Sequence, residues 1–104
     1  MVLTKDFKDT VVERAKREPE FRTGLLTEAV ECILNNEVDV AKVLLRDYVN
    51  ATLGFKELGK IVHKEPKSLM RMLSGKGNPR LDNVSSLLAS LRQHEGIEFH
   101  VEAK

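Results

Sequence analysis

The sequence predicts an all-α protein of five to six short helices, with a helix-turn-helix in its second half and a short β-strand at its C-terminus. Apolar residues recur at spacings of three and four over most of the 104 residues, which is the period of an amphipathic helix. Proline, glycine and asparagine stand between these stretches, where helices begin and end. Strict alternation of apolar and polar residues, the pattern of a strand, occurs only at residues 97–102.

A chain of this length fits a single domain over residues 1–104, which divides into N-terminal helices, a helix-turn-helix part and a terminal strand. We place these parts at 1–53, 54–93 and 94–104. The first helix is expected from about residue 6, with an apolar stripe of Phe7, Val11 and Ala15. Pro19 ends it, because the residue before a proline avoids helical geometry. The remaining helices outside the helix-turn-helix are expected at about 19–34, 39–52 and 81–93.

The two helices near 55–62 and 66–74 are joined by the turn His63-Lys64-Glu65. Each has apolar residues at i, i+3 and i+4: Leu58, Ile61 and Val62 in the first, and Leu69, Met72 and Leu73 in the second. Pro66 suits the first position of a helix, where the missing amide hydrogen would have no partner. Two short helices with a tight turn form the helix-turn-helix unit, whose second helix can enter the DNA major groove.

If the apolar residues of the second helix point inward, Lys67, Ser68 and Arg71 point outward. Such side chains can reach base edges, so these three are the predicted base contacts. The predicted phosphate contacts flank this helix: Lys56, Lys64, Lys76, Asn78 and Arg80. A helical hairpin with a basic solvated face would show the same spacing, and this alternative stays open.

The distribution of charge supports a nucleic-acid partner, although the formal net charge is only +1. Residues 53–93 hold eight Lys or Arg and three Asp or Glu, a net charge of +5. Residues 1–52 hold eight and ten, and residues 94–104 hold one and three, so each of these parts has a net charge of −2. The basic excess therefore coincides with the helix-turn-helix, as a phosphate-facing surface requires.

The run from Phe55 to Leu91 resembles the addiction-module antidote proteins, which are Xre-type helix-turn-helix antitoxins encoded beside RelE/ParE-type toxins. The similarity rests on Leu58, Ser68-Leu69, Leu73-Ser74, Gly77-Asn78-Pro79 and Leu81. It extends upstream to about Phe21 and downstream to Phe99. The chain departs from the family pattern at Gly59, where alanine is usual, and at the turn, where Gly-hydrophobic-Ser is usual. Histidine can adopt the left-handed conformation that such a turn needs, though less easily than glycine.

This resemblance implies a lambda-repressor-like helix-turn-helix that binds double-stranded DNA at its own promoter and a partner toxin of the RelE/ParE type. The acidic side chains of the first half could meet a basic toxin surface: Glu13, Glu18, Glu20, Glu28 and Glu31. Two alternatives stay open. The helix-turn-helix could survive only as the scaffold of a protein-interaction module, which the altered turn favours. The chain could also be a stand-alone phage-like repressor.

Other classes of protein find little support in the sequence. Cys32 is the one cysteine, which excludes an internal disulfide and fits the reducing cytoplasm, and its apolar neighbours predict burial. No apolar run is long enough to span a membrane, and no signal peptide is expected. His63, His94 and His100 lack the spacing of a metal site. Since nucleophile and phosphate-loop motifs are also missing, we expect neither an enzyme nor a cofactor.

The terminal run Ile97 to Glu102 is expected to form a strand with Ile97, Phe99 and Val101 on one face. A single strand leaves its edge groups unpaired. This favours a homodimer with a two-stranded ribbon between the subunits, or a strand added to the sheet of a partner. The alternative is an extended, frayed tail.

Overall fold

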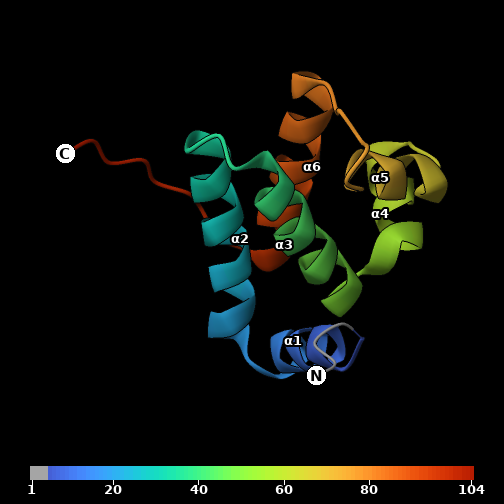
Figure 1. Cartoon of the computed structure of the whole chain (residues 1–104), viewed down its shortest axis with the longest axis horizontal. Coiled ribbons are helices and arrows are strands. Elements are labelled where there is room, and N and C mark those ends of the chain that lie inside the picture. The colour runs from blue at the N-terminus through green and yellow to red at the C-terminus, as the bar shows by residue number, and fades with distance from the viewer. Residues whose placement is uncertain (1–4) are drawn as a thin grey trace.

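Helix α3 runs through the middle of the molecule, with α2 on one side and α4 and α5 on the other (Figure 1). The computed structural model describes the backbone of residues 5–104 and the side chains from Thr10 onward. The helices of this part are α1 (Lys5–Arg17), α2 (Pro19–Leu34), α3 (Val38–Ala51), α4 (Gly54–Val62), α5 (Pro66–Met72) and α6 (Leu81–Glu95). The prediction of an all-α fold is confirmed for these residues. None of these helices is long and apolar enough to cross a membrane.

One cluster of buried apolar side chains joins all six of these helices. Tyr48 and Val49 of α3 belong to this cluster, and both are fully buried. Ala15, which was predicted on the apolar stripe of the first helix, is also fully buried, whereas the side chain of Phe7 lies outside the described residues. Cys32 is buried, as its apolar neighbours predicted.

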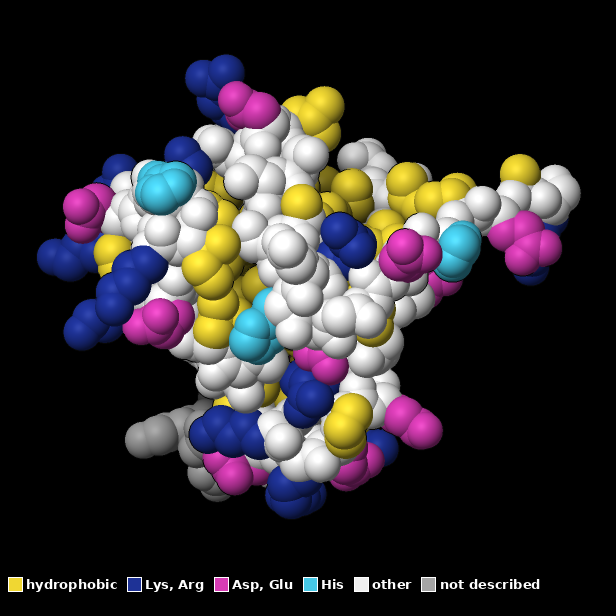
Figure 2. Space-filling model, turned by 180° about the vertical axis from the view of Figure 1, so that it is seen from behind, with side chains coloured by type: hydrophobic (Ala, Val, Ile, Leu, Met, Phe, Trp, Pro, Cys, Tyr) yellow, Lys and Arg dark blue, Asp and Glu magenta, His cyan; other side chains and the backbone are white. Residues whose placement is uncertain are grey.

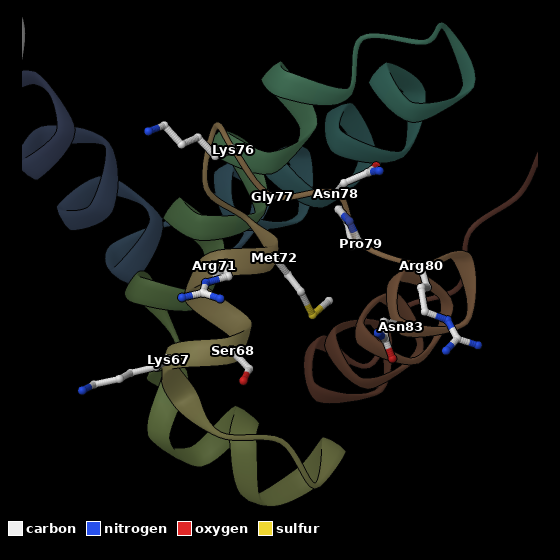
Figure 3. Close-up of a pocket in the computed structure, with 10 residues that line it drawn as sticks. All are labelled: Lys67, Ser68, Arg71, Met72, Lys76, Gly77, Asn78, Pro79, Arg80 and Asn83. Atoms are coloured by element: carbon white, nitrogen blue, oxygen red, sulfur yellow. The ribbon is translucent and has the colours of Figure 1, made fainter.

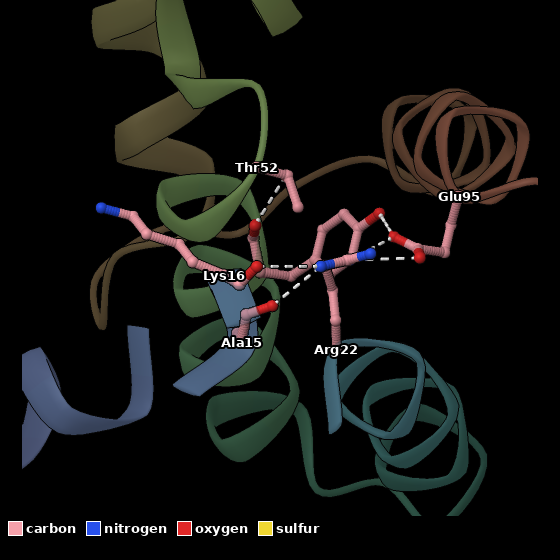
Figure 4. Close-up of polar contacts among 6 residues, drawn as sticks. Ala15, Lys16, Arg22, Thr52 and Glu95 are labelled. Carbon is pink, nitrogen blue, oxygen red and sulfur yellow. Dashed lines mark hydrogen bonds and ion pairs between the residues drawn. The ribbon is translucent and has the colours of Figure 1, made fainter. Parts of the chain in front are cut away.

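A polar network inside this packing ties four helices together (Figure 4). Arg22 of α2 donates two hydrogen bonds from Nε to the Glu95 carboxylate of α6, at 2.9 and 3.1 Å, and one from Nη1 to the Ala15 carbonyl of α1 at 2.9 Å. The Tyr48 hydroxyl of α3 donates to Glu95 Oε1 at 2.5 Å. The Glu95 carboxylate thus accepts hydrogen bonds from two different helices in a largely buried place, and such partners are the condition for a buried charged group to stabilise a fold.

The network shifts the pKa values of two of its members. Burial raises the pKa of Tyr48 above its usual value, and the hydrogen bond to Glu95 raises it further. Burial of Glu95 alone would raise the pKa of its carboxyl group. The hydrogen bonds from Arg22 and Tyr48, together with the positive charges of Arg22 and His94, outweigh this effect, so the pKa of Glu95 lies below its usual value.

Two apolar side chains are exposed: Ile61, which was predicted on the inward face of its helix, and Leu81. Ile61 of α4 is 52% exposed, because a helix of nine residues presents a narrow face and Leu58 and Val62 occupy it. Leu81 is 84% exposed, since it is the first residue of α6 and its side chain lies at the end of the packed layer. The predicted inward side of α5 is confirmed, with Leu69 and Leu73 buried and Met72 packed against the core.

The predicted C-terminal strand is absent from the structure of the single chain. Residues 97–104 contain no strand and form an irregular tail, whose end points away from the helices (Figure 1). Ile97 and Phe99 pack against the core, while Val101, predicted on the same face, is 79% exposed. The alternation of the sequence is real, but a strand is defined by pairing, and the described part of the chain offers no sheet edge to pair with.

Candidate nucleic-acid interface

The outward face of α5 carries the three predicted base contacts. Lys67, Ser68 and Arg71 are exposed, while Leu69 on the opposite side is 1% exposed and anchors the helix in the core. Glu65 precedes the helix in an extended conformation, and Pro66 occupies its first turn as predicted. The apolar spacing of the sequence therefore fixes which side of α5 meets solvent.

A hollow of about 400 Å³ lies between α5, the loop that follows it and the start of α6 (Figure 3). It brings together six of the eight predicted residues: Lys67, Ser68, Arg71, Lys76, Asn78 and Arg80. Met72 and Asn83, which were not predicted as site residues, also line it, and Figure 3 shows both between α5 and α6. No acidic residue of the described chain lines this hollow, so its surface is suited to an anion.

The other two predicted residues, Lys56 and Lys64, line a second open hollow of about 530 Å³ beside the turn between α4 and α5. Lys60, which was not predicted, joins them there and also forms an ion pair with Glu57 at 3.2 Å. The two hollows are neighbours at the start of α5, because Pro66 lines one and the next residue, Lys67, lines the other. Lys and Arg side chains gather over α4 and α5 at the left edge of Figure 2. We refer to the two hollows together as the basic face.

The turn between α4 and α5 depends on two unusual residues. His63 adopts the left-handed conformation, with φ 58° and ψ 48°, and lets the Lys64 N–H donate to the Gly59 carbonyl at 3.0 Å. A Cβ atom on Gly59 would lie 2.5 Å from the Lys64 carbonyl oxygen, closer than real Cβ contacts. The glycine therefore makes room for this turn, and Gly59 and the turn residues are physically linked.

The loop after α5 is held from inside the molecule by two cations of α3. The amine of Lys42 donates to the Gly77 carbonyl, and Nη1 of Arg46 donates to the Leu73 carbonyl at 2.8 Å. Lys42 is only 6% exposed. Gly77 is required at this point, because a Cβ there would lie 2.6 Å from the Met72 carbonyl oxygen and closer still to that of Arg71.

Sequence reasoning missed Lys42 and Arg46, although one signal was present. They stand one helical turn apart, beside the buried Ala41 and Leu45 of α3, on a face where charged side chains are out of place. Their acceptors are backbone carbonyls 35 and 27 residues away, which no local spacing reveals.

The eight predicted residues thus line two hollows that border α4, α5 and the following loop. Six share the larger hollow and two share the smaller one. Compared with protein-family models, with curated proteins and with solved structures, the chain gives no match.

Proposed function

We propose that this protein is a DNA-binding transcriptional regulator, in which α4 and α5 form a lambda-repressor-like helix-turn-helix and α5 enters the major groove. The observation that carries the proposal is the convergence of six predicted contact residues on one hollow free of acidic lining. Lys67, Ser68 and Arg71 would meet base edges, because Lys and Arg can donate to guanine and Ser to either a base or a phosphate.

The remaining predicted residues would position the protein on the DNA backbone. Lys76, Asn78 and Arg80 frame the same hollow, and Lys56 and Lys64 lie in the second one, before α5. Contacts to phosphate at both ends of α5 would fix its register in the groove without reading sequence themselves. Such binding releases counterions, so we expect affinity to fall steeply as the salt concentration rises.

The first test is a titration of the protein against the DNA upstream of its own gene and against a scrambled duplex, at two salt concentrations. A preference for its own DNA that persists at the higher salt supports sequence-specific regulation. Equal, salt-sensitive binding to both duplexes would show that the basic face binds DNA without recognising its base sequence. Absence of binding to either duplex would contradict the proposal.

The same titration with Arg71→Ala tests the position of α5. We expect the variant to lose about 1–3 kcal/mol of binding free energy and to relax the preference at one base position. The matched control is Arg17→Ala, which removes an equal charge from an exposed residue of α1 and should leave specificity unchanged. Unchanged affinity and specificity in Arg71→Ala at fixed salt would mean that α5 does not lie in the major groove.

We further propose that the regulator is a cytoplasmic, homodimeric antitoxin of the Xre type, which represses its own promoter and neutralises a RelE/ParE-type toxin. The toxin part is supported by the sequence resemblance and by the exposed acidic residues Glu20, Glu28 and Glu31 along α2. Glu13 and Glu18 already form ion pairs with Lys16 and Arg14 and contribute less free charge.

The toxin proposal is best tested by charge reversal, because Leu26 and Ala29 of α2 are fully buried in the core and deletion of this helix would unfold the protein. The double variant Glu28→Lys/Glu31→Lys should weaken binding of a RelE/ParE-type toxin encoded beside this gene by roughly tenfold at low salt. Glu57→Lys, an exposed acid on α4, serves as the control. Equal toxin affinity in the double variant and the wild type would place the toxin site elsewhere, and no adjoining toxin gene would favour a stand-alone repressor.

A second function, that of a protein-interaction module built on the same helices, is favoured by two exposed apolar side chains. Ile61 of α4 is 52% exposed and Met70 of α5 is 46% exposed. Apolar residues on this unit would suit a protein partner better than a phosphate backbone. Partner binding that Ile61→Ser abolishes, in a protein that binds neither duplex, would select this function.

A further inference from the structure

The C-terminal tail is anchored at one point and unpaired beyond it. Gly96 ends α6 with φ 72°, the Ile97 N–H donates to the Arg92 carbonyl at 3.2 Å, and Arg92 Nη1 donates to the Ile97 carbonyl at 3.0 Å. From Glu98 to Lys104 the backbone makes no hydrogen bond to any other described residue. The tail stands away from the body at the right of Figure 2.

Unpaired backbone groups in a segment with alternating side chains form the edge that another strand can join. The apolar side chains of the tail are also only partly covered by the rest of the protein. A hollow of about 170 Å³ separates the tail from α2, and the exposed side chains of Val101 and Leu34 both line it. Val101 is 79% exposed and Leu34 is 64% exposed. A strand beside the tail would cover apolar surface as well as backbone groups.

We propose that a second copy of this chain fills this edge, with the two tails antiparallel and Val101 opposite Val101 of the second copy. In this register the cross-strand partners are oppositely charged, polar with acidic, or both apolar: Glu98 with Lys104, His100 with Glu102, and Phe99 with Ala103. The pairing uses residues 98–104, which is the stretch whose backbone groups are unpaired.

The other registers are less suitable. An antiparallel pair centred on His100 would place Glu98 opposite Glu102 twice. A pair centred on Glu102 would place this residue opposite its own copy, and parallel tails would also place like charges opposite each other. Centring the pair on Phe99 requires the backbone of Ile97, whose N–H and carbonyl are already bonded to Arg92. A register centred between two residues would place apolar side chains of one tail directly opposite polar side chains of the other. Among these registers, charge and backbone availability therefore favour Val101 as the centre.

This inference deepens the homodimer of the proposed function and rests on that part of it, but it does not rest on DNA binding. The first experiment measures the molar mass of the full chain by sedimentation over a concentration series, without DNA. We expect a dimer that Glu98→Lys and Lys104→Glu each weaken by about tenfold, because each change turns two attractions into two repulsions. The double variant Glu98→Lys/Lys104→Glu should restore the dimer.

The single variant Glu98→Lys also separates the registers, since it would strengthen a pair centred on His100 by placing a lysine side chain opposite Glu102. Wild-type protein that is monomeric at all concentrations, or a double variant no better than the single ones, would overturn the inference. Specific DNA binding by such a monomer would leave the proposed regulator intact, so the two failures are distinguishable.

The second experiment places a cysteine in the tail, where it can react without disturbing the buried Cys32. Directly opposed residues have Cβ atoms close enough for a disulfide, so Val101→Cys should form a covalent dimer on mild oxidation. His100→Cys is the matched control, because residue 100 opposes residue 102 in this register. Faster cross-linking of His100→Cys than of Val101→Cys would overturn the proposed register, with the helical circular dichroism of both variants confirming the fold.

Discussion

Lys42 can keep its charge in a buried position because its amine has an acceptor there and its aliphatic part has apolar neighbours. Its amine donates to the Gly77 carbonyl, and Arg46 one turn later donates to the Leu73 carbonyl. Both acceptors lie just after α5, near the end where the helix dipole is negative and favours a cation. The aliphatic part of the Lys42 side chain lies among apolar residues such as Leu45. These two side chains therefore support the loop that walls the larger hollow of the basic face.

At the scale of single residues, we predict that Lys42→Met weakens the support of the loop that follows α5. Methionine keeps the volume but cannot donate, so the Gly77 carbonyl loses a hydrogen bond from a charged group. We expect the free energy of unfolding to fall by about 1.5–3 kcal/mol. Affinity for the upstream DNA should fall about tenfold at a temperature where the variant remains folded, because misplacement of the loop costs contacts worth about 1–3 kcal/mol.

The matched control for this prediction is Lys16→Met, which changes an exposed lysine of α1. It should alter neither quantity by more than a few tenths of a kcal/mol, as for most surface substitutions. Chemical denaturation and the DNA titration measure both. A destabilised Lys42→Met variant with unchanged DNA affinity would contradict the supporting role.

At the scale of elements, the helices could be predicted because their ends have local causes. Pro19 and Pro66 lie in the first turns of α2 and α5, and Gly96 ends α6 in the left-handed conformation. The strand could not be predicted in the same way, because pairing depends on a partner rather than on the segment itself. The exposure of Ile61 also escaped prediction, since spacing shows which residues share a face but not how much of that face is covered.

The turn between α4 and α5 leads to a prediction about Gly59. Alanine normally stabilises a helix relative to glycine by up to about 1 kcal/mol. At Gly59 we expect the opposite sign, because the added Cβ would lie 2.5 Å from the Lys64 carbonyl oxygen, a rigid backbone atom. The cost of overpacking is about 1–3 kcal/mol, so Gly59→Ala should be less stable than the wild type.

Gly24 of α2 provides the matched control, because a Cβ there would meet no atom within 4 Å. Gly24→Ala should therefore stabilise the protein, and the two substitutions should shift the melting temperature in opposite directions. Thermal unfolding monitored by circular dichroism measures both. Stabilisation by both changes would mean that the turn can move away from residue 59 at little cost.

At the scale of the whole molecule, the network of Arg22, Tyr48 and Glu95 links stability to pH. The pKa of Glu95 is lowered in the folded protein, so its carboxylate contributes stability above the ordinary pKa of about 4.5. This contribution is lost as the pH falls through the lower pKa of the folded state. Acid should therefore loosen the contact of α6 with α1, α2 and α3.

We predict that Glu95→Gln lowers the free energy of unfolding at neutral pH by about 1.5–3 kcal/mol, the value of hydrogen bonds to a charged group. The difference from the wild type should shrink as the pH falls from about 4.5 towards the lower pKa of the folded state, because the unfolded chain takes up its proton at residue 95 before the folded protein does. Urea denaturation at a series of pH values measures it, with the exposed Glu57→Gln as control. A difference that is independent of pH would show that charge on Glu95 adds nothing to the fold.

The basic face and the acidic parts of the chain lie on different sides of the molecule. Helices α4 and α5 occupy the right side of Figure 1, whereas α2 and the tail lie on the left. Residues 53–93 have a net charge of +5, and the two flanking parts have −2 each. A molecule with a net charge of only +1 thus carries its positive and negative excess on separate parts of the chain. In the field of a polyanion it would rotate during diffusion, so that most encounters would begin with the basic face forward.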